Sequence, residues 1–156
     1  MNNNQILTGR FDGSSNEMIV WANGEIVTRV TQFNDSFGVL INNDGVAAGL
    51  GSNGISQDDS LIIANAFGEF DVVATITGSA GWSSLTAINE QGSVVGNYSA
   101  GSGSSDWQAF LWSDKSGLQL IEPTAETTYV YDIDEQNRVA GQILLAGSYH
   151  AMLWEN

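Results

Sequence analysis

The sequence predicts an all-β fold made of antiparallel four-stranded units, with a propeller-like arrangement as the first interpretation and a β-sandwich as the alternative. Three observations carry this prediction. A nine-residue motif recurs along the chain, a short apolar run rich in β-forming residues follows each copy, and 18 glycines against one proline indicate frequent tight turns. Apolar residues nowhere keep the spacing of an amphipathic helix.

The recurring motif has the general form Ile-Asx, two further residues, a turn residue and a strand that ends in glycine. Its copies are residues 41–49, 88–96 and 133–141, and residues 1–9 fit the same pattern more loosely. The Asn or Asp side chain opens a turn by bonding to its own backbone, and the fourth turn position needs a residue that tolerates positive φ. Gly45, Gly92 and Asn137 are such residues, whereas Gln5 departs from the pattern. We therefore expect antiparallel hairpins with four-residue loops.

A glycine ends every copy of the motif, at one phase of the strand that follows the turn. These residues are Gly9, Gly49, Gly96 and Gly141. Glycine inside a strand usually marks a β-bulge or a close approach of two backbones. We expect one of these features at each position.

A second shared block, at residues 18–21, 61–64, 109–112 and 151–154, predicts the next strand. Glycine turns follow the first three blocks, and a third and a fourth strand complete each unit before the next motif. The predicted units of this single domain are approximately 1–40, 41–87, 88–132 and 133–156, the last being incomplete. An incomplete unit exposes a strand edge, so either the terminal pieces combine or a homodimer forms through that edge.

The charge balance limits the classes of partner. Four Lys and Arg residues against 18 Asp and Glu residues give a net charge of −14, which disfavours nucleic acids and anionic membranes. An acidic surface attracts cations or a basic protein, or simply maintains solubility. The absence of cysteine excludes disulfides and thiolate metal sites. Residues 1–5 show neither a basic nor an apolar signal region, so no secretory signal peptide is expected and the localisation stays unknown.

Residues 88–96 with 109–112, and 134–141 with 150–154, resemble the extracellular HAF repeat family. His150, Ala151 and Met152 stand in the place of the His-Ala-Phe triplet that gives this family its name. The resemblance implies a propeller-like β-repeat protein of bacterial, mostly secreted type. It implies no catalytic activity, and it suggests an extracellular location.

The sequence gives only weak signals for catalytic or metal-binding residues. His150 is the only histidine, and we expect it to be structural, beside the strand core. The segments 132–137 and 42–45 superficially resemble calcium loops, but their spacing fails the EF-hand pattern and the turns already explain their Asx residues. The neighbours Asp58 and Asp59 are not a catalytic pair on sequence grounds. We expect no enzymatic activity, no metal and no cofactor; a hydrolase would need carboxylates that converge near His150.

The aromatic residues divide into two groups. Trp21, Trp112 and Trp154 occupy equivalent positions, so core packing is expected for them. The predicted ligand-binding residues, in or beside Gly/Ser-rich loops, are Trp82, Trp107, Tyr98 and Tyr149. The chain is therefore predicted to be a non-enzymatic binding module that presents loops to a protein or glycan partner. The alternative is an acidic inhibitor or immunity-like protein that binds a basic partner.

Overall fold

The computed structural model describes residues 1–13, 15–54, 58–79, 83–99, 106–122 and 125–155, and in this part of the chain the fold is all-β. The described residues form fourteen strands, and every pairing between them is antiparallel except that of β2 with β4. They are β1 (Leu7–Asp12), β2 (Asn16–Ala22), β3 (Glu25–Val30), β4 (Asp35–Ile41), β5 (Ala47–Ser52), β6 (Asp59–Ala64), β7 (Phe70–Ile76), β8 (Ser83–Ile88), β9 (Val94–Ser99), β10 (Trp107–Ser113), β11 (Gly117–Ile121), β12 (Thr127–Ile133), β13 (Val139–Leu145) and β14 (Ser148–Trp154).

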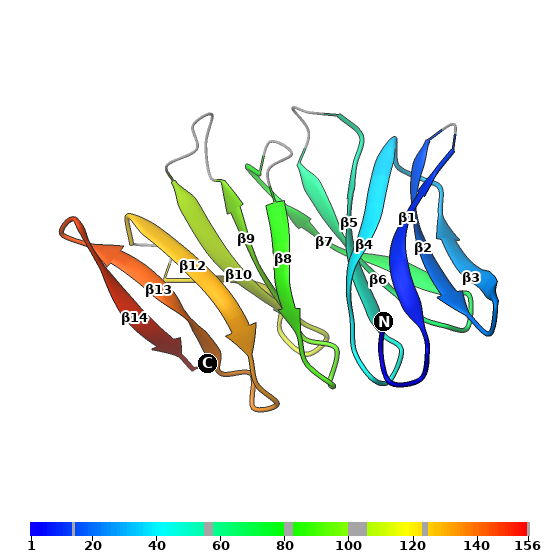
Figure 1. Cartoon of the computed structure of the whole chain (residues 1–156). Coiled ribbons are helices and arrows are strands. Elements are labelled where there is room, and N and C mark those ends of the chain that lie inside the picture. Colours follow the sequence, from blue (N-terminus) through cyan, green and yellow to red (C-terminus); the bar gives the residue numbers. More distant parts are fainter. Residues whose placement is uncertain (14, 55–57, 80–82, 100–105, 123–124, 156) are drawn as a thin grey trace.

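The strands form four layers that lie side by side in chain order, from blue to red in Figure 1. The first layer is β1–β3, the second β4–β7, the third β8–β11 and the fourth β12–β14. A single parallel pair, Asn16 with Asp35, joins the first two layers into one seven-stranded sheet. Each later layer combines the last strand of one predicted sequence unit with strands of the next unit, so the first and fourth layers have three strands each.

The motif turns form as predicted. The fourth turn residue donates its backbone N–H to the carbonyl oxygen of the opening Asx, at 3.2 Å for Gly45 to Asn42 and 3.0 Å for Gly92 to Asn89. The equivalent residue Asn137 also has a positive φ, of 60°, and so has Gln5, the residue that departs from the pattern. The turn therefore imposes its backbone conformation even where no glycine is present.

Three of the four motif glycines, Gly49, Gly96 and Gly141, lie beside β-bulges, which confirms the prediction for them. It is wrong for Gly9, which pairs with Ile19 in a regular ladder and whose Cβ position has no neighbour within 4 Å. The register shifts after Gly38, Leu85 and Val130, which pair with Gly49, Gly96 and Gly141 respectively. The bulged residues are Val39, Thr86 and Tyr131. Each bulge bends the first strand of a layer over the second, which brings the two backbones together at the glycine.

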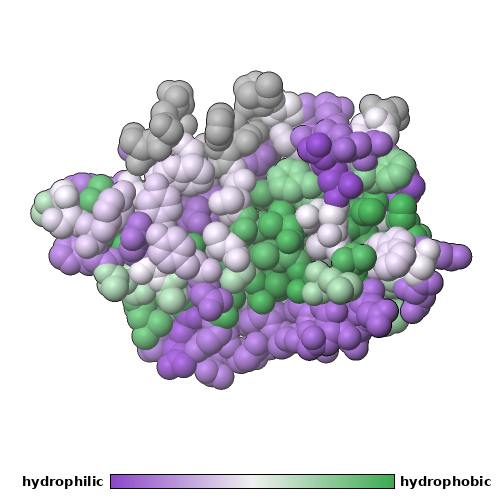
Figure 2. Space-filling view, viewed as in Figure 1, coloured by the Kyte–Doolittle hydropathy of each residue, from purple (hydrophilic) through white to green (hydrophobic). Residues whose placement is uncertain are grey.

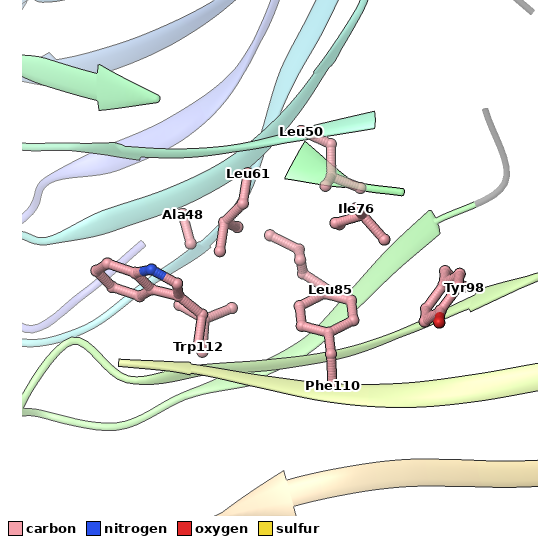
Figure 3. Packing of buried hydrophobic residues seen from close by; sticks show 9 residues of the cluster. Ala48, Leu50, Leu61, Ile76, Leu85, Tyr98, Phe110 and Trp112 are labelled. Carbon is pink, nitrogen blue, oxygen red and sulfur yellow. The ribbon is translucent and has the colours of Figure 1, made fainter. Parts of the chain in front are cut away.

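Three apolar clusters hold the layers together, one at each joint between neighbours. Side chains alternate along a strand, so every layer has one face toward the next layer, here called the forward face, and one toward the preceding layer, the rear face. At the joint of the second and third layers, Leu61 and Ala48 lie on the forward face of the second layer. They pack against Phe110 and Trp112 on the rear face of the third layer (Figure 3). Equivalent clusters form at the other two joints.

The three tryptophans expected in the core differ in how deeply they are buried. Trp112 is buried and Trp154 packs against the cluster between the third and fourth layers, whereas Trp21 is only half-buried. On the face shown in Figure 2, hydrophobic side chains gather around β4 and β1, and hydrophilic ones follow the lower edge, where the motif turns lie. Exposed Phe11, Phe37 and Val39 belong to these two strands. In the described part of the chain, nothing helical is long and apolar enough to cross a membrane.

Candidate functional site

Three aromatic rings form a row across the third and fourth layers. The ring centroids of Trp107 on β10 and Tyr129 on β12 lie 6.1 Å apart, and those of Tyr129 and Tyr149 on β14 lie 6.4 Å apart. The ring planes are tilted by 33° and 43°. Trp107 and Tyr149, two of the four predicted ligand-binding residues, are thus brought together by a third residue that the sequence analysis did not name.

The register of the fourth layer explains the row. Tyr129 pairs with Gln142 on β13, and Tyr149 pairs with Leu144, two residues further along the same strand. Both tyrosines therefore lie on the forward face, diagonally across β13, at a distance that aromatic side chains bridge. Trp107 occupies the position in β10 that Tyr149 occupies in β14. The row is accessible, because Tyr149 is 54% exposed and the other two rings are half-buried.

Hydroxyl and amide groups accompany the rings. Burial raises the pKa of Tyr129, and the nearby phenols of Tyr149 and Tyr131 raise it further. The Tyr129 phenol is therefore protonated at neutral pH, when it both donates and accepts hydrogen bonds. Tyr131 is exposed beside the row, and half-buried Gln142 shares the forward face. The site offers flat apolar surfaces together with neutral hydrogen-bonding groups.

The other two predicted site residues do not join this row. Tyr98 is buried on the rear face of the third layer, and its ring lies 6.5 Å from that of Phe110. Burial raises the pKa of its phenol. Trp82 lies outside the described residues. Tyr129 escaped the sequence analysis because it lies in a strand rather than a glycine-rich loop, although the Tyr129–Tyr131 alternation just before a motif turn was a usable signal.

A groove of about 790 Å³ lies between the second and third layers. Trp112, Phe70 and Val73 contribute apolar surface to it, and the carboxylates that line it are those of Glu69, Asp71 and Asp114. None of the described residues that line it is basic. One carboxylate oxygen of Glu69 accepts a hydrogen bond of 2.8 Å from the Asn65 amide. The groove lining combines aromatic side chains with negative charge.

The side-chain oxygens of the Asx residues in the motif turns already accept hydrogen bonds within their own turns. Asp134 accepts backbone N–H groups from Gln136 and Arg138, both at 2.9 Å, and its other oxygen forms an ion pair with Arg138. These interactions, first of all the backbone hydrogen bond from Arg138, lower the pKa of Asp134. The Oδ1 of Asn42 likewise accepts the N–H of Val46 at 2.9 Å. Among the residues that the structure describes, no cluster of three or more His, Cys, Asp or Glu side chains is placed to hold a metal ion.

His150 does not lie where the sequence analysis expected it. We expected a structural position beside the strand core, but the imidazole is exposed on the edge strand β14. The residues facing the cluster of the third joint from β14 are its neighbours along the same alternation, Met152 and Trp154. His150 extends the same face beyond the end of that cluster and is exposed there among the described residues.

The sequence matches no protein-family model and no curated protein.

Proposed function

We propose that the chain is a non-enzymatic binding module that holds a glycan on the aromatic row of Trp107, Tyr129 and Tyr149. The observation that carries this proposal is the row itself: three rings, from three strands of two layers, remain accessible side by side. Aromatic side chains give a large contact area at a small cost in conformational entropy. A fixed β scaffold adds to this by holding the rings in place before the ligand arrives.

The chemistry of the row favours sugars among possible ligands. The negative face of an aromatic ring attracts the polarised C–H groups on the flat face of a pyranose ring. The tyrosine hydroxyls and the Gln142 amide are suited to the sugar hydroxyls. Single-stranded nucleic acids also stack on aromatic rings, but a protein with a net charge of −14 repels them. A neutral glycan can stack on the rings and is not repelled by the negative charge of the protein.

A glycan array followed by titration of its hits tests this proposal. Tyr149→Ala and Trp107→Ala should each weaken binding by about tenfold or more, as expected for aromatic contact residues. Phe67→Ala is the matched control, because Phe67 is 87% exposed in the β6–β7 turn and lies outside the row. Retention of full affinity by both row variants, or an array without any hit, would refute the proposal.

A second candidate function rests on the groove between the second and third layers. The carboxylates of Glu69, Asp71 and Asp114, which line the groove together with aromatic side chains, favour a basic partner protein, in the manner of an acidic inhibitor. Such a complex should weaken strongly as salt is added. Binding of lysine- or arginine-rich peptides should fall when Asp71 and Asp114 are changed to Asn. Peptide binding that is indifferent to salt and to both substitutions would exclude this function.

The scaffold that we propose for this module is propeller-like. The forward face of each layer packs on the rear face of the next at all three joints, as blades do, whereas a sandwich pairs two sheets only once. In a propeller, equivalent positions of successive blades lie at the same rim. Trp107 and Tyr149 are equivalent residues, so this scaffold would place both of them at one rim.

A further inference from the structure

The forward face of the fourth layer is exposed at positions that are buried in the other layers. Leu153 is 64% exposed, whereas Leu111, its equivalent in the third layer, is 1% exposed beneath the fourth layer. Ala151 and Ala140 are exposed as well, and their equivalents in the third layer are fully buried. The fourth layer thus presents an apolar face with the residue pattern of a joint, and no layer of the described residues packs on it.

The rear face of the first layer likewise exposes residues whose equivalents in the third layer are buried. Phe11 is 38% exposed, and the equivalent Tyr98 on the rear face of the third layer is 6% exposed against the second layer. The Arg29 guanidinium lies 4.4 Å above the Phe11 ring, which covers one side of it only. Trp21 is half-buried, while its equivalent Trp112 is buried. Both outer faces of the molecule therefore carry the aromatic and aliphatic residues of a joint.

A separate hollow on the first layer corresponds to one wall of the groove between the second and third layers. Its volume is about 360 Å³, against about 790 Å³ for the groove between the second and third layers. The third-layer wall of the full groove consists of Gln91, Gly92, Trp112 and Asp114. The equivalent residues Asn4, Gln5, Trp21 and Asn23 line the smaller hollow. What the smaller hollow lacks is the wall that the preceding layer supplies in the full groove.

We propose that the forward face of the fourth layer binds the rear face of the first layer in a second copy of this chain. The contact is head-to-tail and repeats the joints within the chain. It accounts for Leu153, for Phe11 and for the hollow at Trp21 with one kind of interface that the molecule already forms three times. Because the two surfaces differ, the contact is heterologous and generates rings or open chains of copies.

This assembly does not depend on the proposed glycan site and leaves it open. Trp107, the equivalent of Tyr149, stays half-exposed although the fourth layer is packed on the third. Among the described residues, moreover, the first layer contains no strand equivalent to β12, which is the strand that brings Tyr129 against Trp107. A docked copy would therefore place no such strand over Tyr149.

A ladder of hydrogen bonds along the motif turns distinguishes the contact between copies from the joints within the chain. The side-chain amide of Asn2 donates to the carbonyl oxygen of Asn42 at 2.8 Å, Asn42 donates to Asn89 at 3.0 Å, and Asn89 donates to Asp134 at 3.0 Å. Asp134 has no amide to donate to Asn2 of the next copy. The contact between copies lacks this bond, so we expect it to be weaker and reversible.

Sedimentation velocity over a concentration series tests the proposal. The wild-type chain should show a mass that rises with concentration. Leu153→Asp and Phe11→Asp should each abolish this rise, because each places a carboxylate in the contact without disturbing a buried residue. An equimolar mixture of the two variants should form dimers and nothing larger, since one unmodified contact remains between them. Phe67→Asp, at an exposed aromatic residue outside both faces, should behave as wild type.

A gain-of-function variant provides an independent arm. Asp134→Asn adds the missing donor and should tighten the association by about threefold to tenfold, the usual effect of one hydrogen bond. Three results would overturn the proposal. These are a wild-type chain that stays monomeric at every concentration, a mixture of the two Asp variants that stays monomeric, and an Asp134→Asn variant that associates no more tightly than wild type.

Discussion

Gly96 lies so close to the backbone carbonyl oxygen of Ser84 that a Cβ atom on this glycine would overlap that oxygen. Gly49 and Gly141 stand in the same relation to the carbonyl oxygens of Phe37 and Tyr129. Gly9 does not, because no other described strand pairs with β1 on the edge away from β2, and a Cβ there would meet nothing within 4 Å. The same motif glycine is thus structurally required in three layers and unconstrained by packing in the first.

Substitution of these glycines should therefore give opposite results. Gly96→Ala should lower the free energy of unfolding by about 2 kcal/mol or more, because the methyl group meets backbone atoms and the Phe110 ring at 2.6 Å. Gly9→Ala should change it by less than about 0.5 kcal/mol. Denaturant unfolding of both variants measures the difference. Equal destabilisation by the two substitutions would show that the overlap with Ser84 is not the cause.

The ladder along the motif turns makes a second prediction at Asn89. This buried amide donates to the Asp134 carbonyl oxygen at 3.0 Å and to the Asn137 side chain at 2.9 Å, while its own oxygen accepts the N–H of Ser93 at 2.9 Å. Asn89→Asp retains the accepting oxygen and loses both donors. It also places a buried charge beside two oxygens, so unfolding at pH 7 should become easier by about 3 kcal/mol.

The control for this prediction is Asp134→Asn. It keeps the same turn geometry and loses only an exposed ion pair with Arg138, so it should affect unfolding of the monomer much less than Asn89→Asp does. Chemical denaturation at low protein concentration, where copies do not associate, compares the two variants. A small effect of Asn89→Asp would mean that the ladder contributes little to the joint between the third and fourth layers.

A buried hydroxyl makes a third prediction. Thr128 on β12 is fully buried, and its Oγ1 makes no hydrogen bond within the described part of the chain. A buried hydroxyl without a partner destabilises the folded state, and valine has almost the same shape. Thr128→Val should therefore raise the free energy of unfolding by about 1 kcal/mol. A destabilised variant in thermal or chemical unfolding would contradict the assignment of Thr128 as unpaired.

The local features of this fold could be predicted from the sequence, whereas the exposure of individual faces could not. The motif turns and bulges follow from Asx, glycine and strand propensity, which act over a few residues, and even Gln5 obeys them. Whether Leu153 or Leu111 is buried depends on a neighbouring layer, although the two residues have the same local sequence. The same reason explains why His150 was expected beside the core and lies exposed.

The aromatic row shows the same division. Trp107 and Tyr149 were found because they stand out beside polar loops, but Tyr129 joins them only through the pairing of β12 with β13 and the packing of β12 against β10. Tyr98 has the same composition around it, yet its phase in β9 directs it into the core between two layers. Composition therefore identified aromatic candidates, and strand phase decided which of them share a surface.

The last prediction concerns Asp59, which takes in the second layer the position of Trp107 and Tyr149. Burial raises the pKa of this carboxyl above 3.8, although its polar neighbours Ser79 and Ser83 act in the opposite direction; the charge of Asp58 adds to the rise. The folded state therefore holds its proton more tightly than the unfolded state. The contribution of Asp59 to stability is fully present below pH 3.8 and is lost as pH rises through its folded pKa.

Asp59→Asn removes the charge and should unfold less readily than wild type at pH 7. The advantage should shrink as pH falls and vanish below pH 3.8, where the wild-type carboxyl is protonated in both states. Thermal unfolding at several pH values measures this. Asp71→Asn, at an exposed residue of β7, controls for the change in net charge. If the two variants show the same pH dependence, the effect belongs to the net charge and not to burial of Asp59.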